Sequence, residues 1–279
     1  MNRLDELLDL IKKAEDNGDI QLKAQLLKEA TELSLELYGR GSKMHMALQS
    51  EYGGMLRYIG KTKEAIKVLS EVCELCTPCC SQVTDEYCTA LINLASAYLY
   101  DGNLDESEKL FIEAKNALPM KDYRYASICN NMSALYQKQG RYDKAIATME
   151  EALSIIPDDN PDYIEEYCST LGNFAYVIIS MAEAVKDQLE DTKPLLKRAN
   201  EYLSLAINKL RQFDMDNQVI YASIINQKAS VLALLEEYTY ALAFYKEAYE
   251  ICKSRLGTES SAAKTINRNI THLESLIGV

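Results

Sequence analysis

The sequence contains few residues that interrupt helices, with 11 glycines and 5 prolines among 279 residues. Alanine, leucine, glutamate and lysine, which favour helices, are abundant. No window alternates β-branched and polar residues as a half-exposed strand does. Apolar residues make up 48% of the chain, which is enough to fill a core. We therefore expect an all-α fold.

Long apolar runs and an export signal are also absent. The first ten residues, MNRLDELLDL, carry four charged side chains and lack the apolar centre and small-residue cleavage site of a signal peptide. The longest apolar stretches, such as 174–179, are too short to cross a bilayer of about 30 Å. The expectation is a cytoplasmic protein with no membrane partner.

Catalytic motifs are missing as well. The sequence has no glycine-rich phosphate loop and no G-x-S-x-G motif. Its two histidines, His45 and His272, are not placed to act as a general base for a neighbouring nucleophile. We therefore predict that the protein is not an enzyme and needs no cofactor.

Positive charge is in deficit, because 30 lysines and arginines face 42 aspartates and glutamates for a net charge of −12. Nucleic acid and anionic membrane surfaces need a basic face, so neither is expected as the main partner. The acidity peaks in PDDNPDYIEE, 157–166, interpreted as a solvated loop and helix start. Alternatively, this run could dock a basic segment of a partner.

Four of the eight cysteines lie within VCELCTPCCSQ, 72–82: Cys73, Cys76, Cys79 and Cys80. Without an export signal, reduced thiols are expected rather than disulfides. The simplest interpretation is that Cys73 and Cys76 pack as small apolar residues at a helix end. A thiolate metal site and redox-active thiols are the alternatives, but a structural zinc site usually gathers two such pairs, and only Cys88 lies nearby. We predict no metal site.

A repeated pattern organises the chain. Its clearest copy, ASICNNMSALYQKQGRYDKAIATMEEALSIIP at 126–157, reads as two amphipathic helices joined at Gly140 and ended by Pro157. Equivalent copies surround three earlier glycines, at positions 18, 60 and 102, so the turn glycines are spaced by 42, 42 and 38 residues.

Beyond Gly140 the frame continues through asparagine and glutamine positions 131, 173, 227 and 269, in steps of 42, 54 and 42 residues. Glu236 replaces the turn glycine. The twelve extra residues of the longer step predict an insertion at 180–196 in the fifth repeat, as a lengthened first helix and a loop before Pro194. The sequence thus predicts a single solenoid over 1–279, with about six helix pairs and a closing helix at 262–277.

The pattern of Tyr136, Gly140, Ala145, Ala152 and Pro157 resembles the tetratricopeptide repeat, and the resemblance covers nearly the whole chain. The 42-residue step resembles the subclass found in kinesin light chains and many bacterial proteins. The resemblance implies a right-handed superhelix of antiparallel helix pairs that serves as a scaffold for protein or peptide ligands. Small residues are expected to let neighbouring helices approach closely, at positions 65, 107, 145 and 241 and at 30, 72, 114, 152 and 248.

In such a superhelix the first helix of each pair lines the concave surface. A ladder of carboxamides follows this stripe: Asn93, Asn131, Asn173, Gln227 and Asn269, with Asn130 and Asn226 one residue earlier in their copies. Each carboxamide can both donate to and accept from a peptide backbone. The ladder resembles the asparagine ladder in the repeat superhelix of O-GlcNAc transferase and the peptide groove of kinesin light chains. Alternatively, these amides could simply bond neighbouring helices.

Four further residues are predicted to line the same trough: Arg57, Tyr58, Tyr100 and Lys138. They would supply aromatic faces and two positive charges. Our leading hypothesis is an adaptor that holds an extended partner segment in this groove.

Two alternatives remain at this stage. One is a sensory module that responds to a signalling peptide, like bacterial regulators with these repeats. The other is weak self-assembly through the terminal helices, because an apolar stripe in the last helix would have no following repeat to cover it. That stripe comprises Ile266, Ile270, Leu273 and Leu276.

Overall fold

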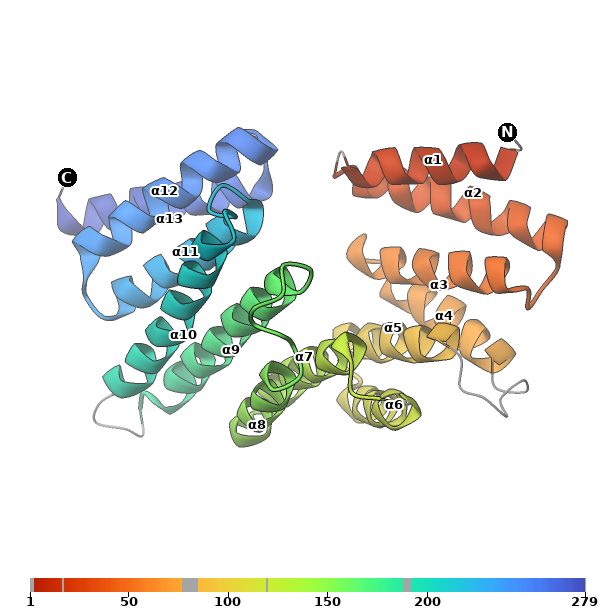
Figure 1. Ribbon diagram of the computed structural model, residues 1–279, viewed down its shortest axis with the longest axis horizontal. Coiled ribbons are helices and arrows are strands. Elements are labelled where there is room, and N and C mark those ends of the chain that lie inside the picture. Colours follow the sequence, from red (N-terminus) through yellow and green to blue (C-terminus); the bar gives the residue numbers. More distant parts are fainter. Residues whose placement is uncertain (1–2, 17, 77–84, 119, 188–191, 279) are drawn as a thin grey trace. The chain divides into compact units, whose positions relative to one another are not determined.

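The computed structural model describes residues 3–16, 18–76, 85–118, 120–187 and 192–278 (Figure 1). Every regular element in these ranges is an α-helix, and consecutive helices pack in contact as pairs. The predicted all-α fold of helix pairs is therefore confirmed. The helices form two compact units, 1–121 and 122–279. Continuity of one solenoid over 1–279 stays a prediction.

The first unit contains three helix pairs. Its helices are α1 (Arg3–Asp16), α2 (Ile20–Tyr38), α3 (Lys43–Tyr58), α4 (Thr62–Cys76), α5 (Asp85–Asp101) and α6 (Leu104–Ala117). A cluster of buried leucines from the first four helices forms its core, including Leu7, Leu27, Leu56 and Leu69.

The second unit contains three helix pairs and a last single helix. Its helices are α7 (Tyr123–Lys138), α8 (Tyr142–Leu153), α9 (Ile164–Val185), α10 (Lys193–Gln212), α11 (Val219–Leu234), α12 (Tyr238–Leu256) and α13 (Ser261–Ile277). Within the predicted insertion at 180–196, α9 continues to Val185 and α10 begins at Lys193. Residues 188–191 lie outside the described residues.

The turns between paired helices share one backbone geometry. Gly18, Gly60, Gly102 and Gly140 all have positive φ, between 67° and 87°. After Gly140 the Arg141 N–H donates to the Tyr136 carbonyl at 2.8 Å, which closes the helix end. Glycine adopts this left-handed conformation without steric cost, and that explains its recurrence at this place.

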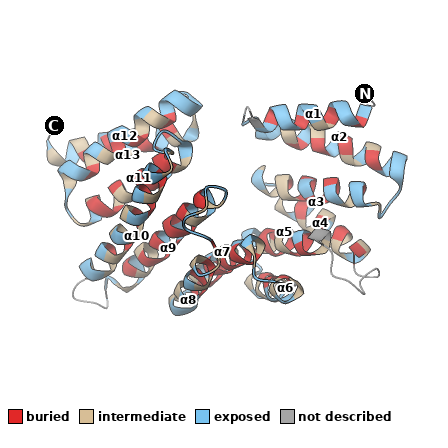
Figure 2. Ribbon diagram, viewed as in Figure 1, coloured by how far each residue is buried: buried red, intermediate tan, exposed pale blue. Residues whose placement is uncertain are grey.

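The small residues predicted at the helix contacts are all fully buried. Ala65, Ser107, Ala145 and Ala241 expose 0% of their surface, as do residues 30, 72, 114, 152 and 248. Figure 2 shows such buried positions along one side of successive helices. The prediction is confirmed. Ser107 is tolerated because its Oγ donates to the Ala95 carbonyl at 2.8 Å, so that no buried hydroxyl is left unpaired.

Helix α9 contains the apolar stretch 174–179, which was judged too short to cross a membrane, but the helix itself extends over 22 residues. Among the described residues it is the one helix of 18 or more residues whose length and composition would allow it to cross a membrane. However, half of its apolar window is buried, and it contacts α7, α8, α10 and α11. Phe174 and Ile178 expose 0% of their surface. Its packing is that of a core helix.

The apolar stripe of α13 is covered, contrary to prediction. Ile266, Ile270 and Leu273 expose 4%, 7% and 3% of their surface, and α13 contacts α12. Only Leu276 of the stripe is exposed, at 58%. The prediction that this stripe is uncovered was wrong, because the last helix is amphipathic and packs its apolar side against the preceding helix pair. The predicted weak self-assembly loses this support.

Candidate functional site

The carboxamide of Asn93 contacts the preceding repeat of the first unit. Its Nδ2 on α5 donates to Ser50 Oγ on α3 at 3.2 Å. The Asn93 side chain also lies in ordinary van der Waals range of a Cβ placed at Gly54 on α3. Its Oδ1 accepts no hydrogen bond from any described residue. The amide therefore joins two neighbouring first helices through its donor and keeps its acceptor available.

In the second unit the same bond recurs 43 residues apart. Asn173 Nδ2 on α9 donates to Asn130 Oδ1 on α7 at 3.3 Å, and Asn130 Nδ2 donates to Thr170 Oγ1 on α9 at 2.9 Å. Asn131 instead donates to the Ser127 carbonyl of its own helix at 2.9 Å. Asn130, Asn173 and Thr170 thus link α7 to α9.

The last three carboxamides lack these links. Gln227 occupies the place of Asn173 one repeat later, so its partner would be the residue equivalent to Asn130. That residue is Gly172, which has no side chain to accept a hydrogen bond, and Gln227 Oε1 lies 3.2 Å from a Cβ placed there. Gln227 Oε1 and Asn226 Oδ1 are buried without a hydrogen-bond partner in the described part of the chain. Asn269 on α13 is half-buried and makes no hydrogen bond to a described residue.

A groove lies beside the ladder in the second unit, and we call it the α7–α9 groove. It has a volume of about 590 Å³. Its lining comes from three helices: Ala134, Gln137 and Lys138 of α7, Tyr142 of α8, and Tyr176, Ser180, Glu183 and Ala184 of α9. Ala134 is exposed at its floor and Tyr176 is 57% exposed.

The α7–α9 groove continues the ladder along both helices. Asn131, Ala134 and Lys138 are spaced by three and four residues, so they share one face of α7. Asn173 and Tyr176 share the equivalent face of α9. The structure thus brings Lys138 into a groove on the face that carries Asn131.

Lys138 is the one groove residue predicted from the sequence as a ligand contact, and the polar side chains of Gln137, Tyr142, Ser180 and Glu183 are additions from the structure. Ser180 and Glu183 continue the spacing of Asn173 and Tyr176, and they lie in the part of the insertion that was predicted to lengthen the first helix, but they were not predicted to line a groove. Gln137 donates to Ser180 Oγ and so bridges α7 and α9. Tyr142 starts a second helix, so a search restricted to first helices could not find it.

In the first unit the predicted residues Arg57, Tyr58 and Tyr100 meet. The guanidinium carbon of Arg57 on α3 lies 4.6 Å from the ring centroid of Tyr58 and 5.0 Å from that of Tyr100 on α5. Both rings are largely exposed, at 66% and 61%. These distances are typical of cation–π contacts. The three side chains form a surface cluster, which we call the Arg57 cluster.

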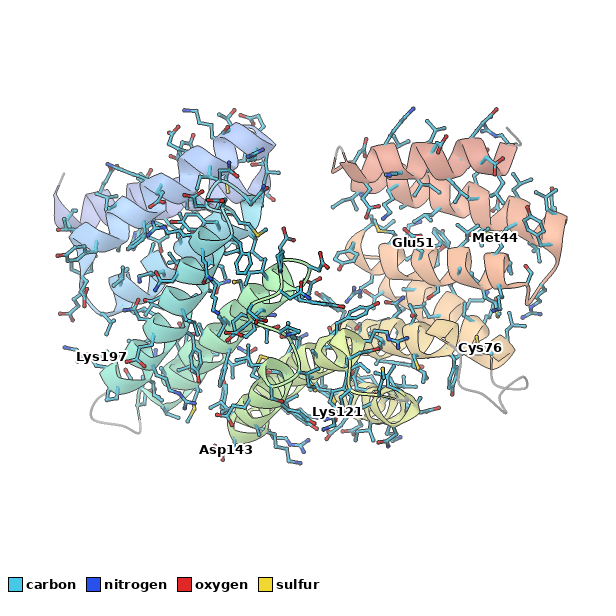
Figure 3. The ribbon with its side chains drawn as sticks, in the orientation of Figure 1. Met44, Glu51, Cys76, Lys121, Asp143 and Lys197 are labelled. Carbon is cyan, nitrogen blue, oxygen red and sulfur yellow. The ribbon has the colours of Figure 1, made fainter. Side chains whose placement is uncertain are left out.

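In the first two repeats the positions equivalent to the ladder hold acids, Asp9 and Glu51, and Glu51 has an ionic partner that was not predicted from the sequence. Lys23 on α2 pairs with Glu15 at 2.9 Å and with Glu51 on α3 at 3.0 Å (Figure 3 labels Glu51). Burial lowers the pKa of Lys23, but its hydrogen bonds to both carboxylates raise it overall. Lys23 replaces the small packing residue of the other repeats and ties α1, α2 and α3 together.

The described cysteines pack as apolar residues. Cys76 is buried and Cys73 half-buried, while Cys79 and Cys80 lie outside the described residues. Burial raises the pKa of the Cys73 thiol to about 12, and nearby Cys76 adds to the shift. A thiol with such a pKa is protonated at neutral pH and a poor nucleophile. Within the described ranges no three His, Cys, Asp or Glu side chains gather as metal ligands.

Comparison with known proteins identifies the repeat. Residues 86–158 match the family model described as tetratricopeptide repeat. No curated protein matches the chain in sequence. The apo form of RapI superposes on 99% of this chain and 72% of its own, with a TM-score of 0.60 and 14% identity.

Two further solved structures resemble this chain over most of its length. BtubC (BKLC) from P. vanneervenii covers 78% of this chain and 92% of its own, with a TM-score of 0.56 and 17% identity. The TPR-like repeats of a Podosopora anserina protein described as a kinesin light chain cover 72% and 95%, with a TM-score of 0.56 and 16% identity. At these identities the likeness establishes the fold.

Proposed function

We propose that this chain, whose residues 86–158 match the tetratricopeptide repeat and whose fold is that of the solved repeat structures, is a protein-interaction scaffold that holds an extended partner segment along its first helices. The observation that carries the proposal is the α7–α9 groove, which is open, about 590 Å³ in volume and lined by polar and aromatic side chains. Such a groove can take several residues of a peptide, because ligand sites commonly have volumes of 300–1,000 Å³.

The carboxamide oxygens of the ladder would accept hydrogen bonds from the bound segment. The donors of Asn93, Asn131 and Asn173 are used within the protein, whereas the Oδ1 atoms of these three residues accept no hydrogen bond from a described residue. A carboxamide oxygen can accept a peptide N–H whatever the peptide side chain is. The amides would therefore contribute acceptors for a partner's backbone as well as links between repeats.

The net charge of −12 also supports a partner segment that carries basic residues, because long-range attraction increases the rate of encounter. This contribution weakens with added salt, since charges further apart than about 10 Å are largely screened at 0.1 M ionic strength. The proposal includes no catalytic step.

A peptide selection tests the proposal. Phage that display random linear peptides would be selected on the intact protein, and the dissociation constant of an enriched peptide would be measured by fluorescence polarisation. Ala134→Arg fills the floor of the α7–α9 groove and should weaken binding at least tenfold. Ala147→Arg is the matched control, because Ala147 is exposed on the second helix α8 and lies outside the lining.

Equal binding by the Ala134→Arg and Ala147→Arg variants would rule out the α7–α9 groove as the site. Failure to enrich any peptide on the intact protein would contradict binding of an extended segment altogether. Circular dichroism spectra of both variants should match the intact protein, because each substitution places a long side chain at an exposed position.

A further inference from the structure

The Arg57 guanidinium has no polar partner among the described residues, although it is held between two side chains. It lies 4.6 Å and 5.0 Å from the ring centroids of Tyr58 and Tyr100, and it forms no ion pair and donates no hydrogen bond to any described residue. Several other arginines are paired: Arg3 with Glu29 at 2.7 Å and Arg124 with Asp122 at 2.6 Å. Arg57 therefore combines a fixed position with unused donors.

This combination suits recognition of a carboxylate. A guanidinium has five N–H donors in a planar fork, and it can stack on aromatic rings while its donors bind a carboxylate through two parallel hydrogen bonds. The rings limit the freedom of the Arg57 side chain before binding, so less entropy is lost on binding. The exposure of Tyr58 and Tyr100 leaves the cluster accessible to a partner.

A small hollow adjoins the Arg57 cluster in the same unit. It measures about 200 Å³ and shares Tyr58 with the cluster. Its apolar lining includes Ala14, Ile20 and Met55, from α1, α2 and α3. The volume is below that of most small-molecule sites, and it suits a single apolar side chain.

We propose that the Arg57 cluster binds one acidic residue of the partner segment, while the adjoining hollow takes an apolar residue two positions away. In an extended chain, residues two apart point to the same side and lie about 7 Å apart. The motif is therefore an apolar residue, any residue, and an acidic residue, in either chain direction. This inference rests on the proposed function, because it requires an extended segment.

The charges around the hollow are compatible with this motif. Glu15, Asp19 and Lys23 also line the hollow; Lys23 pairs with Glu15 and with Glu51, and Asp19 accepts a hydrogen bond from the Leu22 N–H at the start of α2. Both carboxylates of the hollow therefore have a partner, and the acidic residue of the partner segment is assigned to the Arg57 guanidinium rather than to the hollow. A basic stretch elsewhere in the same partner would still gain from the net charge of the protein.

A double-mutant cycle tests the pairing. The probe is a peptide enriched by the intact protein from the random linear library, together with a version in which its acidic residue is replaced by the corresponding amide. For the intact protein this replacement should raise the dissociation constant about tenfold. For the Arg57→Gln variant it should have no effect, because the carboxylate has lost its partner.

Two further variants sharpen the test. Arg40→Gln removes an exposed arginine of the same unit that has no ion pair with a described residue, and it should respond to the amide replacement as the intact protein does. Arg57→Lys keeps the charge but loses the planar fork, so it should retain only part of the preference for the acidic peptide.

The outcomes separate this inference from the proposed function. If the enriched peptides bind but carry no acidic residue at a fixed place, the carboxylate site is wrong and the scaffold function stands. The same conclusion follows if the amide replacement weakens binding to Arg57→Gln as much as to the intact protein. If no peptide is enriched, the proposed function fails and this inference fails with it.

Discussion

Glu236 occupies a backbone conformation that the turns within the first four helix pairs give to glycine. Its φ is 66°, and the Glu237 N–H donates to the Leu232 carbonyl at 2.8 Å, as in the glycine turns. A residue with a Cβ is less stable in the left-handed conformation by about 1–2 kcal/mol. Part of this cost is offset when the residue is compared with glycine, because glycine loses more backbone entropy on folding.

We therefore expect Glu236→Gly to raise the free energy of unfolding by about 0.5–1 kcal/mol. Urea denaturation followed by circular dichroism would measure the change. Glu250→Gly, at an exposed place inside α12, should instead lower it by about 1 kcal/mol. A loss of stability in both variants would show that the Glu236 turn is not strained.

Lys228 is the second residue that departs from the repeat. Its equivalents in the four preceding repeats are Tyr52, Leu94, Met132 and Phe174, all buried. Lys228 Nζ donates to Ser204 Oγ at 2.6 Å and lies 5.3 Å from the Phe244 ring centroid, without an ion pair to a described residue. Burial lowers the pKa of Lys228, and Arg211 lowers it further.

This pKa direction gives a signed prediction. Because the folded protein disfavours the charged amine, Lys228 weakens the fold at neutral pH, and the penalty is relieved as the pH rises through the lowered pKa towards 10.5. Lys228→Met should therefore stabilise the protein at pH 7 by about 1 kcal/mol and by less at pH 10.

Urea denaturation of both proteins at the two pH values would measure the difference. The pKa of Tyr221, which burial raises to about 12, affects both proteins equally and cancels. Lys197→Met is the control, because Lys197 is exposed on α10 (Figure 3) and its loss should change stability by less than about 0.5 kcal/mol. A Lys228→Met variant less stable than the original would contradict the assignment.

At the scale of the helix pair, a tyrosine near the start of the first helix bonds a glutamate of the second. Three pairs share a spacing of 26 residues: Tyr87 with Glu113, Tyr125 with Glu151, and Tyr221 with Glu247. Arg3 and Glu29 occupy the same two places in the first pair. In the fifth pair, once its twelve extra residues are counted, the position equivalent to these glutamates is Leu205, which cannot accept a hydrogen bond through its side chain from Tyr167.

The fifth pair supplies a matched control for the value of this bond. Tyr125→Phe removes a hydrogen bond of 2.6 Å to Glu151 and should cost about 1 kcal/mol of stability, because a half-buried carboxylate loses its hydroxyl donor. Tyr167→Phe should cost close to nothing. Thermal melts of both variants would decide, and equal losses would show that the hydroxyl has no structural role.

At the scale of the whole molecule, each pair depends on its neighbours, so one bad contact should weaken the fold beyond its own helix. Ala145 lies on α8 and exposes 0% of its surface. Ala145→Lys would force a clash and bury a charge, which we expect to lower the free energy of unfolding by roughly 2–4 kcal/mol.

Ala147→Lys, two residues along the same helix, places the same side chain at an exposed site and should be nearly neutral. Differential scanning calorimetry of the two variants would test the register of the repeat. An unchanged melting temperature for Ala145→Lys would mean that the second helix is rotated from the assigned position.

The candidate site was predictable where it depends on position within a helix. Asn131 and Lys138 share one face because of their spacing alone, and the meeting of Arg57, Tyr58 and Tyr100 follows from equivalent places in adjacent repeats. Beyond Tyr176 the repeat spacing predicted a lengthened first helix, but it did not show that Ser180 and Glu183 of this helix line a groove with α7, because that depends on how closely the two helices pack.

The sequence by itself determined the helices, their turns and the register of the repeat, because helical periodicity and the left-handed conformation of glycine are local properties. Only the tertiary structure decided which polar groups pair, as in the bond from Asn173 to Asn130, and which faces are covered, as in α13. Hydrogen bonding and burial depend on residues some 40 positions away, and so on how closely neighbouring repeats pack.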